Sequence, residues 1–214
     1  MAGGEHAMDT LIDLTHQIDN GMPVYPDDVP VTLRKIKTFE KDGYNNHRVA
    51  IGMHAGTHID GPMHLTDSNT FISEVPLERC VGSGVLLDVR NETVITLKDK
   101  YVNRIAPDTI VLFYTGHDSF FGSETYYSAY PMLDEQAAQV LVDKKVKMVG
   151  FDAPSPDREP YPVHTLFLTN NILILENLTN LDALLAYTYF EVIALPLSIR
   201  ADSSFLRVVA RIEE

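Results

Sequence analysis

Basic residues are scarce in this chain. Lysine and arginine together number 17, against 30 aspartates and glutamates, and the formal net charge is −13. Nucleic-acid binders neutralise phosphates with clustered Lys and Arg, and anionic membrane surfaces attract the same side chains. Since no run of such residues is evident along the sequence, we expect neither nucleic acid nor a membrane as a partner. Most of the surplus carboxylates are expected to be solvated surface groups.

Cysteine and long apolar stretches are also nearly absent. Cys80 is the only cysteine. It has no partner for a disulfide within the chain, which indicates a reducing compartment, and a chain of this length buries roughly 70% of its unfolded surface without such a link. Apolar runs such as 172–175 are far shorter than the roughly 20 residues that cross a bilayer, and residues 1–9 lack the features of a secretory signal. We therefore expect a cytoplasmic protein.

Short segments rich in β-branched residues dominate the chain. The segments with the length and composition of strands are 11–14, 31–36, 47–53, 85–89, 109–114, 147–151, 172–175, 189–195 and 206–212. Helical patterns are fewer, at 96–102 with Thr96 as its cap, at 133–144 and at 180–186. This balance predicts one α/β domain over residues 1–214, with a β-rich, partly closed mixed sheet and a few helices.

Loops dense in proline and aspartate interrupt these elements at 22–30, 61–76 and 153–162. Long loops in a compact domain often carry function. Their aromatic and acidic side chains, among them Tyr25, Asp157 and Tyr161, either line a pocket or form turns.

Three of the eight histidines, His54, His58 and His64, fall within eleven residues together with Asp60. A helix is a poor explanation, because the same stretch holds two glycines and a proline. In an extended chain all four side chains point to one face. His54 and His58 would then lie about 13 Å apart, too far to share one ion, so the chain must bend between them, and Gly56 permits the bend.

Two imidazoles and one carboxylate leave coordination positions of a divalent ion open to water, which is typical of a catalytic metal site. Zinc suits this donor set, and manganese suits it if more oxygens join. The alternative is a group of ordinary hydrogen-bonded histidines, as we expect for His6, His16, His47 and His117.

His164 and Glu176 lie twelve residues apart. Glu176 ends an apolar strand, where its carboxylate either meets a metal or is solvated.

The string His54-x-Gly56-Thr57-His58-x-Asp60-x-Pro62-x-His64 resembles the signature of the cyclase-like metal-dependent hydrolase family, which includes bacterial kynurenine formamidase. The resemblance extends along the chain to the blocks 22–26, 115–116, 152–157, 164–178, 196–197, 201–202 and 207–210. The sequence departs from the family pattern at 27–28 and 117–118. These differences concern the substrate pocket more than the metal site.

This resemblance implies a swivelling β/β/α fold and a homo-oligomer, either a dimer or a tetramer. It implies that His54, His58 and Asp60 bind a metal ion, that Asp60 bridges to a second ion held by His164 and Glu176, and that His64 is the catalytic acid/base. Some family members use two zinc ions and others one manganese. Tyr25 falls in the N-terminal block and is our candidate for substrate binding.

The resulting hypothesis is hydrolysis of a small aromatic amide, most concretely the formamide of N-formylkynurenine, by metal-activated water. Ring opening of an isatin-like lactam uses the same chemistry and stays open. A non-haem iron oxygenase built on His58, Asp60 and His164 is a further alternative, although it leaves His54 and Glu176 without a role. The last alternative is a metal-dependent binding module that catalyses no reaction.

Overall fold

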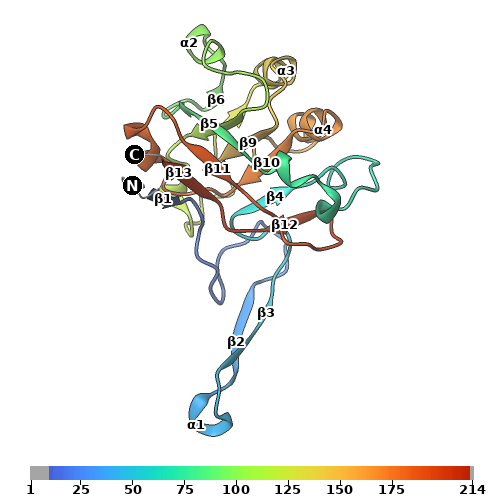
Figure 1. Ribbon diagram of the computed structural model, residues 1–214, viewed down its shortest axis with the longest axis vertical. Coiled ribbons are helices and arrows are strands. Elements are labelled where there is room, and N and C mark those ends of the chain that lie inside the picture. The colour runs from blue at the N-terminus through green and yellow to red at the C-terminus, as the bar shows by residue number, and fades with distance from the viewer. Residues whose placement is uncertain (1–9, 213–214) are drawn as a thin grey trace, which may run out of the picture.

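A computed structural model describes residues 10–212 and is built around one large mixed sheet (Figure 1). The segment 1–9, used above to argue against a secretory signal, and His6 within it lie outside the described residues. Nine strands form the sheet, and their spatial order is β1 (Thr10–Asp13), β13 (Val209–Ile212), β11 (Glu191–Ile193), β5 (Val81–Asp88), β7 (Ile110–Tyr114), β9 (Met148–Phe151), β10 (Leu173–Glu176), β4 (His58–Asp60) and β12 (Ser203–Phe205).

The four central strands β5, β7, β9 and β10 are parallel, and the flanking pairs are antiparallel. The sheet curls so that the chain leaving β1 meets the chain leaving β10. Leu14 accepts a hydrogen bond from the Thr179 amide at 3.1 Å, and Thr15 forms a bridge with Leu178. The predicted mixed α/β fold with a partly closed sheet is confirmed.

Alternate residues of the central strands enter two different cores. In β7, Ile110 and Leu112 join the cluster inside the curl, whereas Val111 and Phe113 join the cluster on the outer face. Helices α3 (Glu135–Asp143) and α4 (Pro162–Thr169) cover that outer face (Figure 1). Both faces of β7 and β9 are buried, so these two strands are apolar throughout, which is the pattern that made them recognisable in the sequence.

The predicted helix at 133–144 forms as α3, which starts two residues later than predicted. Asp134 caps it by accepting hydrogen bonds from the amides of Gln136 and Ala137. The preceding residues instead form β8 (Met132–Leu133), paired with β6 (Val94–Ile95). The helix predicted at 96–102 is reduced to α2 (Asp99–Val102), with Lys98 rather than Thr96 at its cap position. The segment 180–186 forms a 3₁₀ helix, η4 (Leu181–Ala186).

Several elements were not predicted. Helix α4 follows a proline-rich loop and begins at Pro162, so its start was hidden by loop composition. Strand β4 contains His58 and Asp60, and the polar strand β12 is only three residues long. The remaining short helices are α1 (Phe39–Asp42), η1 (Ile72–Glu74), η2 (Leu77–Arg79) and η3 (His117–Phe120).

A β-hairpin formed by β2 (Thr32–Lys37) and β3 (Asn46–Ala50) projects from the body and carries α1 at its tip (Figure 1). The strand predicted at 47–53 ends at Ala50 because the chain there leaves the hairpin. Among the described residues, no helix is both long and apolar enough to pass through a membrane.

Candidate metal centre

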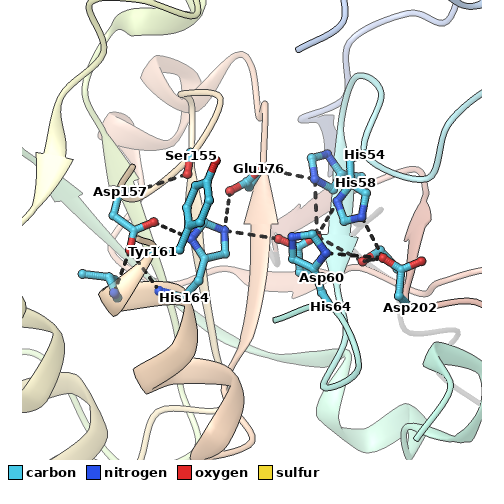
Figure 2. A network of polar contacts seen from close by, with 12 residues as sticks. His54, His58, Asp60, His64, Ser155, Asp157, Tyr161, His164, Glu176 and Asp202 are labelled. Carbon is cyan, nitrogen blue, oxygen red and sulfur yellow. Dashed lines mark hydrogen bonds and ion pairs between the residues drawn. The ribbon is translucent and has the colours of Figure 1, made fainter. Parts of the chain in front are cut away.

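Strand β4 places two donors side by side on the face of the sheet covered by α4. His58 and Asp60 are two residues apart on this strand, while Ile59 between them points into the inner core. The antiparallel register sets Glu176 of β10 directly opposite His58. All three side chains therefore converge on one point (Figure 2), and the predicted proximity of Glu176 to the histidine cluster follows from strand pairing.

The segment before β4 bends at Gly56, as the spacing required. Gly56 has a φ of +64°, and a Cβ there would lie 2.6 Å from the Met22 methyl group. The bend brings the ring of His54 to 5.0 Å from that of His58. A second turn after β4 brings the ring of His64 beside that of His54, with centroids 4.1 Å apart and the two rings tilted by 36°. The bend expected at Gly56 is therefore present, and turns rather than the pleat of a strand bring these outer histidines inward.

Helix α4 supplies His164 from its first turn. The Asp157 carboxylate accepts hydrogen bonds from the backbone amides of Val163 at 2.6 Å and His164 at 3.2 Å, so it satisfies the free donors at the helix start. His164 then reaches across β10, with Nε2 at 3.1 Å from Glu176 and 3.7 Å from Asp60.

Three imidazoles are arranged in the same way. One ring nitrogen, here called the outer one, contacts a protein oxygen, and the other, inner nitrogen faces the carboxylate of Asp60 or Glu176. The outer contacts are His54 Nε2 with Asp202 at 2.8 Å, His58 Nδ1 with the Gly56 carbonyl at 2.9 Å, and His164 Nδ1 with Asp157 at 2.5 Å. The second ring N–H of a metal-binding histidine almost always donates a hydrogen bond to a carboxylate or carbonyl oxygen in this way, which fixes the ring and its tautomer.

Two buried atoms at the centre, His58 Nε2 and Asp60 Oδ2, have no hydrogen-bond partner among the described residues. Carboxylate oxygens do lie 3.2 to 3.4 Å from His58 Nε2. An unsatisfied buried polar group costs about 1–3 kcal/mol. Donor atoms of His54, His58 and Asp60, and those of Asp60, His64 and His164, lie within 4.8 Å of one another. This donor set fits a divalent metal ion, which would satisfy both atoms.

Neighbouring charges within the cluster favour the ionised forms of its histidines and of Asp60. Burial lowers the pKa of His54 and His58, but contacts with Asp202 and Asp60 raise that of His54 to about 9, and Asp60 and Glu176 raise that of His58 to about 10. Burial raises the pKa of Asp60, yet the charge of His58 and contacts with other histidines bring it well below its usual range.

His64 differs from the other three histidines. Burial lowers its pKa below the ordinary value, and the attraction of Asp60 does not compensate. His64 is therefore neutral at pH 7, with Nδ1 3.4 Å from Asp202. A neutral imidazole beside a cluster of charged ones is able to accept a proton.

A cavity of about 150 Å³ opens beside the cluster and is lined by His64, His164 and three tyrosines, Tyr25, Tyr127 and Tyr161. Tyr25 was selected from the sequence, and the structure places it in the wall, edge-on to Tyr127 at 5.5 Å. Tyr127 was missed, because nothing in its local sequence distinguishes it from the other tyrosines.

Two other polar residues, Asp152 at the start of the matching block 152–157 and the histidine His117, lie outside the cluster. Asp152 accepts hydrogen bonds from the amides of Thr115 and Gly116, so it holds a turn. His117 is buried against the Tyr126 carbonyl at 2.8 Å. By contrast, Asp202 contacts two of the clustered histidines and was not selected, since its position in the C-terminal segment gives no sign of proximity.

Comparison with known proteins shows the family to which the chain belongs. A family model described as "Putative cyclase" matches residues 12–158. A kynurenine formamidase from Bacillus cytotoxicus is 30% identical over 207 residues, which cover 94% of this chain and 96% of that protein. The solved structure of a potential metal-dependent hydrolase with cyclase activity has a TM-score of 0.80 at 27% identity, covering 97% of this chain and 100% of that one. Isatin hydrolase A from Labrenzia aggregata, with benzyl benzoate bound, shares the fold, with a TM-score of 0.84 at 24% identity over 96% and 94% of the two chains.

The chain therefore belongs to the cyclase family, since the family model spans more than half of its length. The resemblance first seen in the string from His54 to His64 is confirmed. So is the prediction of an enzyme, at the level of a hydrolase of this family.

Asp202 offers a test of the outer contacts. We expect Asp202→Ala to weaken zinc binding by about 10- to 100-fold, because His54 loses the carboxylate that fixes its ring. Competition with a chromophoric chelator measures this affinity. Asp67→Asn is the matched control, since Asp67 is an exposed acid on the loop that follows His64. Equal zinc affinity in the two variants would contradict the role given to Asp202.

The raised histidine pKa values predict proton release when a metal binds. His54 and His58, with pKa values of about 9 and 10, carry protons at pH 7 in apoprotein prepared with a chelator. A metal ion has to displace them, so zinc affinity should rise with pH between 6 and 8, by about tenfold per pH unit for each proton released. Calorimetry in two buffers of different ionisation enthalpy counts the protons. Identical heats in both buffers would show that the imidazoles are already neutral.

Proposed function

We propose that this chain is a metal-dependent amide hydrolase whose substrate is a small aromatic amide, most concretely N-formylkynurenine. The observation that carries the proposal is the convergence of inward-facing imidazole nitrogens and carboxylates beside a neutral histidine and an aromatic cavity. The similarity to kynurenine formamidases over nearly the whole chain supports the choice of substrate.

The inner donor atoms support the ligand roles that the family resemblance implies. His54, His58 and Asp60 would hold one divalent ion, and His164 and Glu176 would hold a second that Asp60 bridges. When bound, the metal supplies a water of lowered pKa and polarises the carbonyl oxygen of the substrate. Zinc suits the mixture of nitrogen and oxygen donors, and manganese is the alternative if more oxygens join.

His64 is the proposed catalytic acid/base. Its Nδ1 faces Asp202 at 3.4 Å, and its ring lines the cavity, where it would face the scissile amide of a bound substrate. Neutral His64 accepts a proton from the attacking water and delivers it to the departing nitrogen. The delivery matters because an arylamine anion is a poor leaving group. One residue acts as base and then as acid, and it ends the cycle in its starting state.

The cavity wall favours a ring-bearing substrate. Tyr25, Tyr127 and Tyr161 present aromatic surfaces, while Ser155 and Asn177 add polar groups. Tyrosines pack against aromatic rings edge-on or in offset stacks, so they orient a planar substrate without fixing its polar atoms. We assign Tyr25 to substrate binding on this basis.

Two other reactions remain as competitors. An isatin-like lactam would be opened by the same residues, and isatin hydrolase A shares this fold. An iron oxygenase would use His58, Asp60 and His164 and would leave His54 and Glu176 unused, although their donor atoms face the same centre. A binding module without catalysis would show no turnover.

Two further proposals complete the description. We propose a homo-oligomer of two or four chains, which follows from the family resemblance. We also propose a cytoplasmic location, because the single cysteine, Cys80, has no disulfide partner within the chain and so fits a reducing compartment.

The substrate is tested with the purified, zinc-loaded protein. Metal analysis and an ultraviolet assay of N-formylkynurenine and isatin in parallel should show metal-dependent turnover, with N-formylkynurenine preferred. Preference for isatin would replace the named substrate. Oxygen uptake with ferrous iron would favour the oxygenase, and the absence of turnover on any amide, lactam or ester would favour the binding module.

His64→Ala tests the mechanism. We expect it to lower kcat by about 10² to 10⁴, because proton transfer to and from the substrate is lost. Its metal content should stay at the wild-type level, as His64 is not one of the proposed ligands. Wild-type turnover in a metal-loaded His64→Ala protein would refute the assignment, whereas joint loss of metal and activity would make His64 a ligand.

A further inference from the structure

Asn177 lines the cavity and lies directly after Glu176, the last residue of β10. It is 2% exposed and has a φ of +54°, a left-handed conformation that asparagine adopts more readily than most residues. It is neither one of the proposed metal ligands nor the proposed acid/base. Its side chain is therefore a group of the cavity wall to which the proposed reaction assigns no role.

Three of the four polar groups of Asn177 already have partners. Its backbone amide donates to the Ala153 carbonyl at 2.9 Å, and its carbonyl accepts a hydrogen bond from the Thr57 hydroxyl at 2.5 Å. Its Oδ1 accepts one from the Tyr126 hydroxyl at 2.8 Å. Across residues 10–212 the Nδ2 amino group has no acceptor, yet it is not one of the unpaired atoms sealed in the interior. The free donor therefore faces the cavity that Asn177 lines.

Tyr126 fixes which end of the Asn177 amide faces the cavity. The Tyr126 ring is fully buried, and burial raises the pKa of Tyr126, so its hydroxyl stays protonated and needs an acceptor. Oδ1 of Asn177 is the acceptor for that proton, and the described part of the chain offers no other. Reversing the amide would leave the proton unpaired in the interior, which costs more than a hydrogen bond contributes. The amide is therefore held with its NH₂ group toward the cavity.

Tyr126 is itself held in place by neighbouring rings. His117 donates from Nε2 to the Tyr126 carbonyl at 2.8 Å and stacks on the Tyr126 ring with centroids 5.0 Å apart. Phe121 packs edge-on against the same ring at 5.1 Å. His117, at one of the positions that depart from the family pattern, thus supports the group that orients Asn177.

The chemistry of the cavity wall limits what this NH₂ group binds. An amide NH₂ only donates hydrogen bonds, whereas the tyrosine and serine hydroxyls of the wall either donate or accept. Among the described residues no lysine or arginine lines the cavity, and Asp28 and Glu176 add carboxylates to it. A substrate carboxylate would find no basic side chain there. The acceptor that suits Asn177 is therefore a neutral carbonyl oxygen.

We propose that Asn177 selects aryl amides that carry a second carbonyl group ortho to the amide nitrogen, by donating a hydrogen bond from Nδ2 to that oxygen. This inference rests on the proposed amide hydrolysis, in which the scissile carbonyl is the one polarised by the metal. Consecutive Cα atoms are about 3.8 Å apart, so Asn177 presents its donor next to the proposed ligand Glu176 and close to the scissile bond. N-formylkynurenine and isatin both carry a carbonyl in this position, whereas a simple anilide does not.

The test compares two formamides with the zinc-loaded protein. The compound ortho-formamidoacetophenone carries the second carbonyl, and ortho-ethylformanilide has a methylene group in its place. Asn177→Asp keeps an oxygen for the Tyr126 hydroxyl and removes the donor. We expect it to lower the ratio of the two kcat/KM values, ketone over ethyl, by about tenfold relative to wild type, because one hydrogen bond is lost. The intrinsic reactivities of the two substrates cancel in this comparison.

Asn171→Asp is the matched control. Asn171 lies just before β10, at the end of the strand opposite to Asn177, and it is exposed with a φ of +57°. The same substitution in the same backbone conformation should keep the wild-type ratio. Tyr126→Phe frees the Asn177 amide to reverse and should lower the ratio by a smaller factor. Added to Asn177→Asp, it should lower the ratio no further, because Tyr126 acts through Asn177.

The outcomes separate Asn177 from the reaction itself. Equal losses on both formamides, with the ratio unchanged and the metal content intact, would overturn the proposal. A wild-type protein that hydrolyses neither formamide would overturn the proposed substrate class, and binding of the two amine products then decides on Asn177. Its NH₂ resonance is the one that Asn177→Asp lacks in a proton–nitrogen correlation spectrum. A downfield shift with ortho-aminoacetophenone but not with ortho-ethylaniline would support the donor, and an unmoved resonance would refute it.

Discussion

The buried carboxylate of Asp60 is the group on which the candidate site depends. It is fully shielded from solvent, and such a charge is tolerated only with opposite charges and hydrogen bonds around it. His54, His58 and His164 lie 3.0 to 3.7 Å from it. In the apoprotein, protonated imidazoles balance this charge, and a divalent cation would balance it in their place. The same convergence therefore explains the folded geometry, the raised histidine pKa values and the fit to a metal.

The curled sheet is the device that assembles this cluster. Strand β4 contributes two donors, and β10 contributes a third through strand register. Helix α4 is started by Asp157, which also holds His164, so one carboxylate both caps a helix and orients a proposed ligand. Asp202, just before β12, holds the ring of His54 from the opposite side but caps no helix within residues 10–212. Outer groups from distant parts of the chain thus fix rings that local sequence alone would leave free to rotate.

Local patterns predicted much of this. The apolar strands were recognisable because both of their faces are buried, and α3 was recognisable from its amphipathic period. The histidine string was informative because imidazoles and a carboxylate at that spacing are rare outside metal sites, and Gly56 marked the bend. Helix α4 was missed because a proline-rich loop precedes it, and β4 because its polar side chains look unlike a buried strand until their partners are known.

The sequence by itself determined the donor types, the family, the mixed α/β class and the acidic character of the chain, since these depend on residue identity and short-range spacing. Only the tertiary structure decided which nitrogen of each imidazole faces inward, that Asp202 and Asp157 hold two of the rings, and that Tyr126 turns the amide of Asn177 toward the cavity. The reason is physical. These relations depend on strand register, on helix placement and on contacts between residues up to 148 positions apart, which no local pattern encodes.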